Sequence, residues 1–137
     1  MMELVPIGVI RSPYRVHGDA PRQGRLSDVV SEIVVYPAYA PALSDIGKHR
    51  HLIVLYWLDR ADRSALKATP PGTERELGVF STRSPNRPNP IALCLVDLIA
   101  VDGLTLRVRG LEALDGSPLL DIKPYSPAID AAGPGEV

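Results

Sequence analysis

The fold class is decided by Ile-Ala-Leu-Cys-Leu-Val-Asp-Leu-Ile-Ala-Val-Asp-Gly-Leu-Thr-Leu-Arg-Val, residues 91–108. The first eleven of these residues are almost all apolar, which predicts one long, bent strand over residues 91–101. Asp102-Gly103 is a strong hairpin signal and predicts a type I′ turn. In residues 104–108 apolar side chains alternate with polar ones, as in a strand that buries one face. The stretch therefore predicts an antiparallel β-hairpin.

Short strands are predicted along the rest of the chain as well. The segments with strand character are residues 4–10, 31–35, 51–57, 77–81 and 119–122. Residues 39–46 are predicted to form one short helix that Gly47 ends, and Asp115-Gly116 predicts a second tight turn. With 14 prolines interrupting regular structure, the pattern predicts an all-β protein, a barrel or a sandwich, with long proline-rich loops.

Length and composition are typical of a globular protein. The 137 residues are expected to form a single domain, residues 1–137, and 45% of them are hydrophobic, which is enough for a core. Cys94 is the only cysteine, and no signal-peptide pattern or membrane-spanning run is found, so we expect a cytoplasmic protein without membrane contact.

The charge is close to neutral but unevenly placed. The net charge of −1 divides into +3 over residues 1–96 and −4 over residues 97–137. Such a mild asymmetry does not resemble the strongly basic face of an autonomous nucleic-acid binder. It allows a local cationic pocket for a phosphate or a carboxylate.

A stiff polar loop precedes the hairpin. Residues 78–91 run Gly-Val-Phe-Ser-Thr-Arg-Ser-Pro-Asn-Arg-Pro-Asn-Pro-Ile. The three prolines fix φ and remove backbone donors, so this loop can be neither a helix nor a central strand. Because little ordering entropy remains to be lost on binding, a rigid loop with two arginines and two asparagines is suited to hold an anionic or hydrogen-bonding ligand.

Most familiar chemical motifs are absent from the sequence. There is no Gly-rich dinucleotide fingerprint, no Walker loop, no His-Glu-x-x-His and no Cys-x-x-Cys. One cysteine and three histidines disfavour a metal site, and His49 and His51, on either side of Arg50, are better explained as an exposed strand start. Cys94 lies in an apolar run and is predicted to be a core thiol.

Three polar clusters remain as candidate sites: Pro21-Arg22-Gln23, the loop around Arg83, Arg87 and Asn89, and residues 120–125. Each cluster alone has an ordinary structural explanation; Arg87, for example, could cap carbonyl groups. Asp121 and Lys123 are expected on the same side of a strand, where an ion pair could form. Because binding sites gather on loops held by a rigid scaffold, we expect the clusters to converge at one mouth of the β structure.

With these residues in view, the chain resembles the TsaA-like (TrmO/YaeB/VirR) family. The resemblance is carried by residues 7–14, 21–23, 51–57, 78–91 and 120–125, in family order over nearly the whole chain. It implies an S-adenosyl-L-methionine-dependent methyltransferase on a small closed or nearly closed antiparallel β-barrel. It also implies a homodimer with the cofactor in a crevice near the subunit interface. The best-known members methylate N6 of threonylcarbamoyladenosine at position 37 of tRNA, so tRNA is the implied partner.

Site residues follow from the resemblance by motif. Cofactor contacts are implied for Pro21, Arg22, Gln23, Leu58, Asp59, Arg83, Leu93, Leu120, Asp121, Ile122 and Lys123. We expect Arg83 or Arg22 to hold the cofactor's carboxylate.

The candidate catalytic residues are Asn89, Asp121 and Tyr125. Asn89 and Asp121 would accept a hydrogen bond from N6–H, and Tyr125 would stack on or bond to the base. Arg87, Asn89 and Tyr125 are the candidate substrate contacts.

The chain departs from the family pattern in two respects. Asp59 stands where many members have a histidine, and no C-terminal extension domain of the kind that helps longer bacterial members engage tRNA is expected. Two alternatives stay open. One is methyl transfer to another nucleoside or a small molecule, and the other is a non-enzymatic dimeric barrel that binds the cofactor or a partner.

Overall fold

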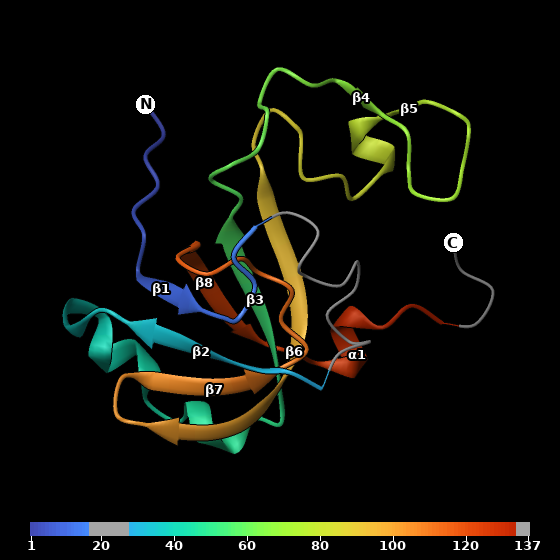
Figure 1. Ribbon diagram of the computed structural model, residues 1–137. Helices are drawn as coiled ribbons and strands as arrows, with labels where there is room; N and C mark the ends of the chain where they lie inside the picture. Colours follow the sequence, from blue (N-terminus) through green and yellow to red (C-terminus); the bar gives the residue numbers. More distant parts are fainter. Residues whose placement is uncertain (17–27, 134–137) are drawn as a thin grey trace.

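Six strands of the computed structural model, which describes residues 1–16 and 28–133, form a closed antiparallel barrel (Figure 1). In barrel order they are β1 (Gly8–Arg11), β2 (Val30–Val35), β7 (Thr105–Arg109), β6 (Ile91–Asp102), β3 (His51–Trp57) and β8 (Pro118–Pro124), and β8 pairs with β1. The predicted all-β fold is confirmed, and of the two predicted architectures the barrel is correct.

The barrel interior is filled by the inward side chains of the alternating strands. Ile10, Ile33 and Leu106 lie opposite one another on β1, β2 and β7 and are fully buried. Cys94 is buried as predicted, and its Sγ lies 3.1 Å from the Gly110 carbonyl oxygen. Burial raises the pKa of the Tyr56 phenol, and the nearby Cys94 and Glu112 raise it further. The interior therefore holds this tyrosine in its neutral form.

Barrel closure depends on a close approach at Gly8. This residue pairs with Val35 of β2 and with Leu119 of β8, so it joins the first strand to both neighbours. A Cβ at this position would collide with the Val34 carbonyl oxygen and would lie 3.1 Å from Cδ2 of Leu119. Only a residue without a side chain allows the three strands to meet here.

The hairpin that the sequence predicts joins β6 and β7. Asp102 pairs with Thr105, so the loop is Gly103-Leu104, with Gly103 at φ 59° and Leu104 outside the positive-φ region. The predicted type I′ turn is therefore wrong, because that turn needs positive φ at both loop residues; glycine in the first position is typical of type II′. β6 is long and bent as predicted, and the register shifts between Leu98 and Ala100.

Two predicted elements take a different form. The predicted helix over residues 39–46 is instead a pair of 3-10 helices, η2 (Pro37–Leu43) and η3 (Ile46–Lys48), and Gly47 lies inside the second. Pro41 removes a backbone donor within η2, and Asp45 at φ 67° interrupts the segment. The predicted strand over residues 77–81 extends only over β5 (Leu77–Gly78), which pairs with β4 (Lys67–Ala68).

The remaining predicted strands are shifted by a few residues. The strand predicted over residues 4–10 begins only at Gly8, and β8 is longer than the predicted 119–122. A short helix, α1 (Pro127–Asp130), follows β8. None of the helices in residues 1–16 and 28–133 is long and apolar enough to cross a membrane.

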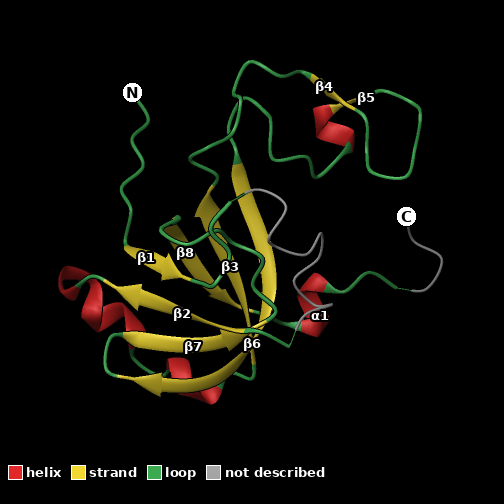
Figure 2. Cartoon of the chain, viewed as in Figure 1, coloured by secondary structure: helices red, strands yellow, loops and turns green. Residues whose placement is uncertain are grey.

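The long connections between strands lie at different sides of the barrel. Residues 58–90, between β3 and β6, form an arm above the barrel that holds β4, β5 and η4 (Val79–Ser81) (Figure 2). The segment between β2 and β3, with η2 and η3, lies at the lower side of the same view. The arm therefore leaves and re-enters the barrel at one end of the β3–β6 pair.

Candidate functional site

The proline-rich loop is fixed where the arm returns to the barrel. Leu58, directly after β3, donates its N–H to the Pro90 carbonyl oxygen at 2.8 Å, and Pro90 is fully buried. The Ile91 N–H reaches back to the Asn89 carbonyl oxygen, also at 2.8 Å. These bonds place residues 88–90 beside the end of β3.

Arg63 organises this loop, and the sequence analysis missed it. Its Nε donates to the Pro88 carbonyl oxygen at 2.8 Å and its Nη2 donates to Oδ1 of Asn89 at 3.1 Å. The guanidinium carbon also lies 5.1 Å from the ring centroid of Trp57, a cation–π contact. No local motif marks Arg63 in the sequence, because all three contacts come from the meeting of distant segments.

A second bond ties the same two segments together. The backbone N–H of Asp62 donates to Oδ1 of Asn86 at 2.9 Å. The Asp62 carboxylate in turn accepts from the hydroxyl and the N–H of Ser64, and these bonds lower its pKa. Residues 62–64 thus hold the proline-rich loop at both Asn86 and Asn89.

The two predicted arginines of the loop differ in their surroundings. Nη1 of Arg87 donates to the carbonyl oxygens of Thr82 and Ser84, both at 3.0 Å. This is the carbonyl-capping role that the sequence left open, and it stiffens the loop from within. Arg83, by contrast, is exposed. Of the two, Arg83 is better placed to meet a ligand.

Two predicted cofactor contacts, Leu93 and Asp121, lie in one row across the outer face of three strands. Leu93 on β6 pairs with Leu55 on β3, and Leu55 pairs with Asp121 on β8. Leu93 is 50% exposed although it lies in a strand, whereas Asp121 is half-buried. The row therefore offers an apolar surface next to a carboxylate.

The Asp121 carboxylate is held by its own strand. Oδ1 accepts from the Ile122 N–H at 2.9 Å, and Oδ2 lies 3.1 Å from Nζ of Lys123, which confirms the predicted ion pair. Leu120 lies at the irregularity in the β8–β3 register, and Ile122 packs against the core. Asp121 and Lys123 are thus the polar side chains that β8 presents on the outer face.

Leu58 and Asp59, the two residues that follow β3, differ in their exposure. The Leu58 side chain is partly buried and packs against the core. Asp59 is exposed, and its Oδ1 lies 3.9 Å from Nε of Arg60. Pro21, Arg22 and Gln23 lie outside the described residues.

Tyr125 is not brought to this end of the barrel. Its N–H donates to the His51 carbonyl oxygen at 3.2 Å, and the two rings meet edge to face at 6.3 Å. His51 and Trp57 are the first and last residues of β3, so Tyr125 and Asn89 are separated by about 20 Å of strand. The expected convergence of all clusters at one mouth is therefore wrong within a single chain, because β8 runs antiparallel to β3 and carries Tyr125 away from the arm.

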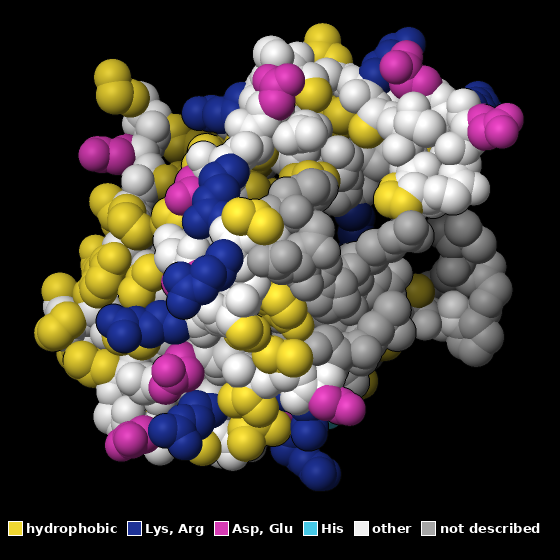
Figure 3. All heavy atoms as spheres, viewed as in Figure 1, with side chains coloured by type: hydrophobic (Ala, Val, Ile, Leu, Met, Phe, Trp, Pro, Cys, Tyr) yellow, Lys and Arg dark blue, Asp and Glu magenta, His cyan; other side chains and the backbone are white. Residues whose placement is uncertain are grey.

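Cationic side chains are not confined to the arm. On the face seen in Figure 3, Lys and Arg side chains are scattered from the top to the bottom of the molecule, with a few carboxylates among them. Several cations of the chain are paired, as in the contacts of Arg107 with Glu32 and of Arg15 with Asp115. The surface thus combines cationic groups with a net charge near zero.

Comparison with known proteins identifies the family. The tRNA-methyltransferase O N-terminal domain matches residues 9–131. The chain belongs to this family. The predicted TsaA-like relationship is thereby confirmed.

Relatives of known name are similar over most of the chain. An Archaeoglobus fulgidus protein named S-adenosyl-L-methionine-binding protein is 57% identical over 94% of this chain and 93% of its own length. The Escherichia coli tRNA (adenine(37)-N6)-methyltransferase is 38% identical over 91% of this chain and 58% of its own length. S-adenosyl-L-methionine, the predicted cofactor, is thus the ligand in the name of a close relative.

Solved structures have the same barrel. A crystal structure of TrmO matches with a TM-score of 0.85 at 33% identity, over 100% of this chain and 63% of that one. TrmO from Pseudomonas aeruginosa matches with a TM-score of 0.82 at 32% identity, over 99% of this chain and 60% of that one. The chain thus spans about three fifths of the length of these solved chains.

Proposed function

We propose that this chain is an S-adenosyl-L-methionine-dependent methyltransferase that acts on N6 of (threonylcarbamoyl)adenosine 37 of tRNA. One observation carries the proposal. The proline-rich loop is locked by Arg63 and Asp62 at the end of β3 that leads to the Leu93–Leu55–Asp121 row. A stiff loop beside an apolar and acidic surface is suited to hold a cofactor in one pose.

The residues present fit the chemistry of this cofactor. Arg83 offers an exposed guanidinium for a carboxylate, half-exposed Leu93 offers an apolar contact, and Asp121 offers acceptors for hydroxyl or ammonium groups. When bound, S-adenosyl-L-methionine supplies a methyl group on a positively charged sulfur. The chain's task is to align donor and acceptor, since alignment is the main contribution that a protein makes to such a displacement.

Adenine N6 needs a hydrogen-bond acceptor, because its lone pair is delocalised and its protons become acidic as the nitrogen gains a bond. Oδ1 of Asn89 already accepts from Arg63, which reduces its capacity. The Asp121 carboxylate keeps further lone pairs beyond its bonds to Ile122 and Lys123. We therefore assign the acceptor role to Asp121, with Asn89 as a positioning group.

The homodimer is part of the proposal. In one chain Tyr125 lies beside His51 and not beside Asn89. Tyr125 joins the site at the arm only if a second copy of the chain brings it there. Arg87 contributes mainly by shaping the loop, because its Nη1 is engaged by two carbonyl groups.

Calorimetry with S-adenosyl-L-methionine tests the cofactor assignment. We expect saturable binding by the wild type and a loss of about 1.5–3 kcal/mol in Arg83→Ala, as for a lost charge-assisted hydrogen bond. Arg75→Ala, which removes an exposed arginine elsewhere in the arm, serves as the matched control and should bind as the wild type does. The absence of wild-type binding at about millimolar cofactor would refute the proposal.

The acceptor is tested with labelled cofactor. Label transferred to tRNA that carries threonylcarbamoyladenosine, and not to tRNA without it, is the expected result. Label found only in low-molecular-weight material would show that the methyl acceptor is a nucleoside or a small molecule and not tRNA. The net charge of −1 favours this alternative. Binding without any turnover to S-adenosylhomocysteine would favour a non-enzymatic barrel, consistent with Asp59 in place of the family histidine.

A further inference from the structure

A polar row crosses the outer face of the barrel at the end of β3 that lies away from the arm. His51 on β3 pairs with Asp97 on β6, and Asp97 pairs with Arg109 on β7. On the other side of β3, the Tyr125 N–H bonds to the His51 carbonyl oxygen, and the two rings meet edge to face at 6.3 Å. Of these four residues, the proposed methyltransferase site makes use of Tyr125 alone.

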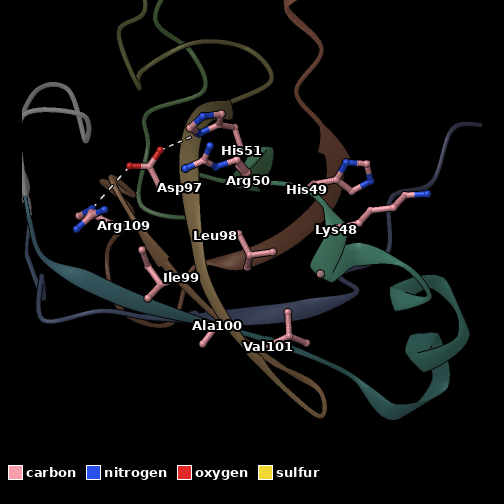
Figure 4. Close-up of a pocket in the computed structure, with 11 residues that line it drawn as sticks. Lys48, His49, Arg50, His51, Asp97, Leu98, Ile99, Ala100, Val101 and Arg109 are labelled. Carbon is pink, nitrogen blue, oxygen red and sulfur yellow. Dashed lines mark hydrogen bonds and ion pairs between the residues drawn. The ribbon is translucent and has the colours of Figure 1, made fainter.

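Asp97 fixes the ring of His51 in one orientation. Nδ1 of His51 lies 2.9 Å from Oδ1 of Asp97, and Oδ2 lies 3.7 Å from Nε of Arg109. Figure 4 shows the carboxylate between the imidazole and the guanidinium. An ionised carboxylate can only accept a hydrogen bond, so Nδ1 of the imidazole carries the proton. In the neutral ring, Nε2 then keeps its lone pair as an acceptor.

This acceptor is open to a ligand. The His51 side chain is 45% exposed, whereas the Asp97 side chain behind it is only 24% exposed. Within the part of the chain that the structure describes, no hydrogen bond occupies Nε2 of His51. The cluster therefore presents one oriented hydrogen-bond acceptor directly beside the Tyr125 ring.

We propose that His51 is a specificity-determining residue, whose Nε2 accepts a hydrogen bond from the ribose 2′-hydroxyl of the nucleotide whose base contacts Tyr125. Asp97 is its positioning residue. The 2′-hydroxyl is the donor that distinguishes RNA from DNA. The inference rests on the proposed function for its ligand, an RNA. Because His51 and Tyr125 are in contact within one chain, the copy that brings Tyr125 to the arm brings His51 with it.

Other partners fit the oriented imidazole less well. A phosphate oxygen only accepts hydrogen bonds, so it cannot pair with the lone pair of neutral Nε2. A metal ion needs several ligands, and no group of three His, Cys, Asp or Glu side chains that could hold one occurs in residues 1–16 and 28–133. A cross-strand pair of His51 and Asp97 with a structural role alone is the competing explanation. It predicts no response of His51 to RNA.

The test uses an anticodon stem-loop RNA that carries threonylcarbamoyladenosine at position 37, and the same stem-loop without the 2′-hydroxyl of this nucleotide. We expect the wild type to bind the first about tenfold more tightly, as for one lost hydrogen bond. His51→Ala should bind both stem-loops equally. The matched control is His49→Ala, which removes an imidazole outside the cluster and should keep the wild-type preference.

The positioning role of Asp97 has a test of its own. Asp97→Asn keeps an acceptor for the Nδ1 proton and should keep the preference for the 2′-hydroxyl, whereas Asp97→Ala should lose most of it. Nitrogen NMR of the His51 ring should show a proton on Nδ1 in the wild type and in Asp97→Asn, and a mixture of tautomers in Asp97→Ala. A structural role alone would leave the 2′-hydroxyl preference unchanged in every variant.

The outcomes separate this inference from the proposed function. Methyl transfer by a wild type that binds both stem-loops equally overturns the role of His51 and leaves the proposed function intact. A wild type that prefers the 2′-hydroxyl through His51 but does not bind S-adenosyl-L-methionine would end the proposed function and leave the RNA contact. A proton on Nε2 in place of Nδ1 in the wild type, or no binding of either stem-loop, overturns the inference.

Discussion

At the scale of single residues, Arg63 shows how one exposed side chain can order a loop. Its planar guanidinium donates to two acceptors on the loop and faces the Trp57 ring at the same time. A lysine has a single charged head without this fork, and it cannot reproduce the three contacts together. Arg63 therefore orders the loop of the proposed cofactor site through Asn89 and the loop backbone.

We expect Arg63→Ala and Arg63→Lys to weaken S-adenosyl-L-methionine binding alike, by about tenfold, because both leave Asn89 without its donor. Trp57 is the only tryptophan, so its fluorescence emission should shift in both variants as the cation leaves its ring. The control is Arg75→Ala, which removes an exposed arginine elsewhere in the arm. Full affinity in Arg63→Lys would show that charge alone suffices.

The buried phenol of Tyr56 makes the free energy of unfolding fall as the pH rises into the alkaline range. Its pKa is raised by burial, so above pH 10 the unfolded chain loses this proton while the folded chain keeps it. The unfolded state then binds fewer protons, and the free energy of unfolding falls as pH rises, by about 1.4 kcal/mol per unit of pH. We expect denaturant unfolding between pH 9 and 11 to show a shallower decline in Tyr56→Phe. Exposed Tyr36→Phe should decline as the wild type does, and equal slopes for all three would contradict the assignment.

At the scale of elements, the junction of β1 with β2 and β8 at Gly8 is sensitive to any added side chain. We expect Gly8→Ala to lower the free energy of unfolding by about 1–3 kcal/mol, because the new methyl group would force the Val34 carbonyl oxygen away from β1. Gly78→Ala is the matched control, since Gly78 has open space around it and a φ of −62°. Urea unfolding of the two variants measures the difference. A Gly8→Ala protein as stable as Gly78→Ala would mean that β1 can shift at no cost.

Elements with a clear hydrophobic period could be predicted from the sequence, and those set by proline or by distant contacts could not. β3 is predicted residue for residue, because its apolar run is too short for a buried helix and is typical of a buried strand. The segment after Gly78 has strand composition, yet Val79–Ser81 forms a 3-10 helix, and the Val79 N–H bonds to the Leu66 carbonyl oxygen across the arm. Such a bond depends on where a distant segment lies, which local composition does not encode.

At the scale of the whole molecule, family motifs propose a set of site residues but say nothing of the distances between them. Leu93 and Asp121 do lie in one row, while Asn89 and Tyr125 lie at opposite ends of β3. Motif order along the chain carries no information on which end of a barrel each loop reaches. A single chain therefore holds only part of the predicted constellation, and a second copy is the economical way to complete it.

We expect the proposed dimer to be held by apolar side chains that the single chain leaves exposed. Phe80 is 84% exposed and Leu66 is 68% exposed, both on the arm, where the Val79 N–H bonds to the Leu66 carbonyl oxygen. Leaving such side chains in water is unfavourable by about 25 cal/mol per Å² of apolar surface, so a partner surface is expected to cover them.

We expect light scattering after size exclusion to give twice the chain mass for the wild type and the single mass for Phe80→Asp, since a carboxylate at a buried contact costs several kcal/mol. Leu4→Asp adds the same charge at another exposed apolar side chain, on the N-terminal segment that precedes β1, and should remain dimeric. If the dimer completes the site, Phe80→Asp should also lose methyl transfer, and mixing it with an Asp121→Asn chain should not restore activity. A wild-type monomer with full methyl transfer would show that Tyr125 is not needed at the arm.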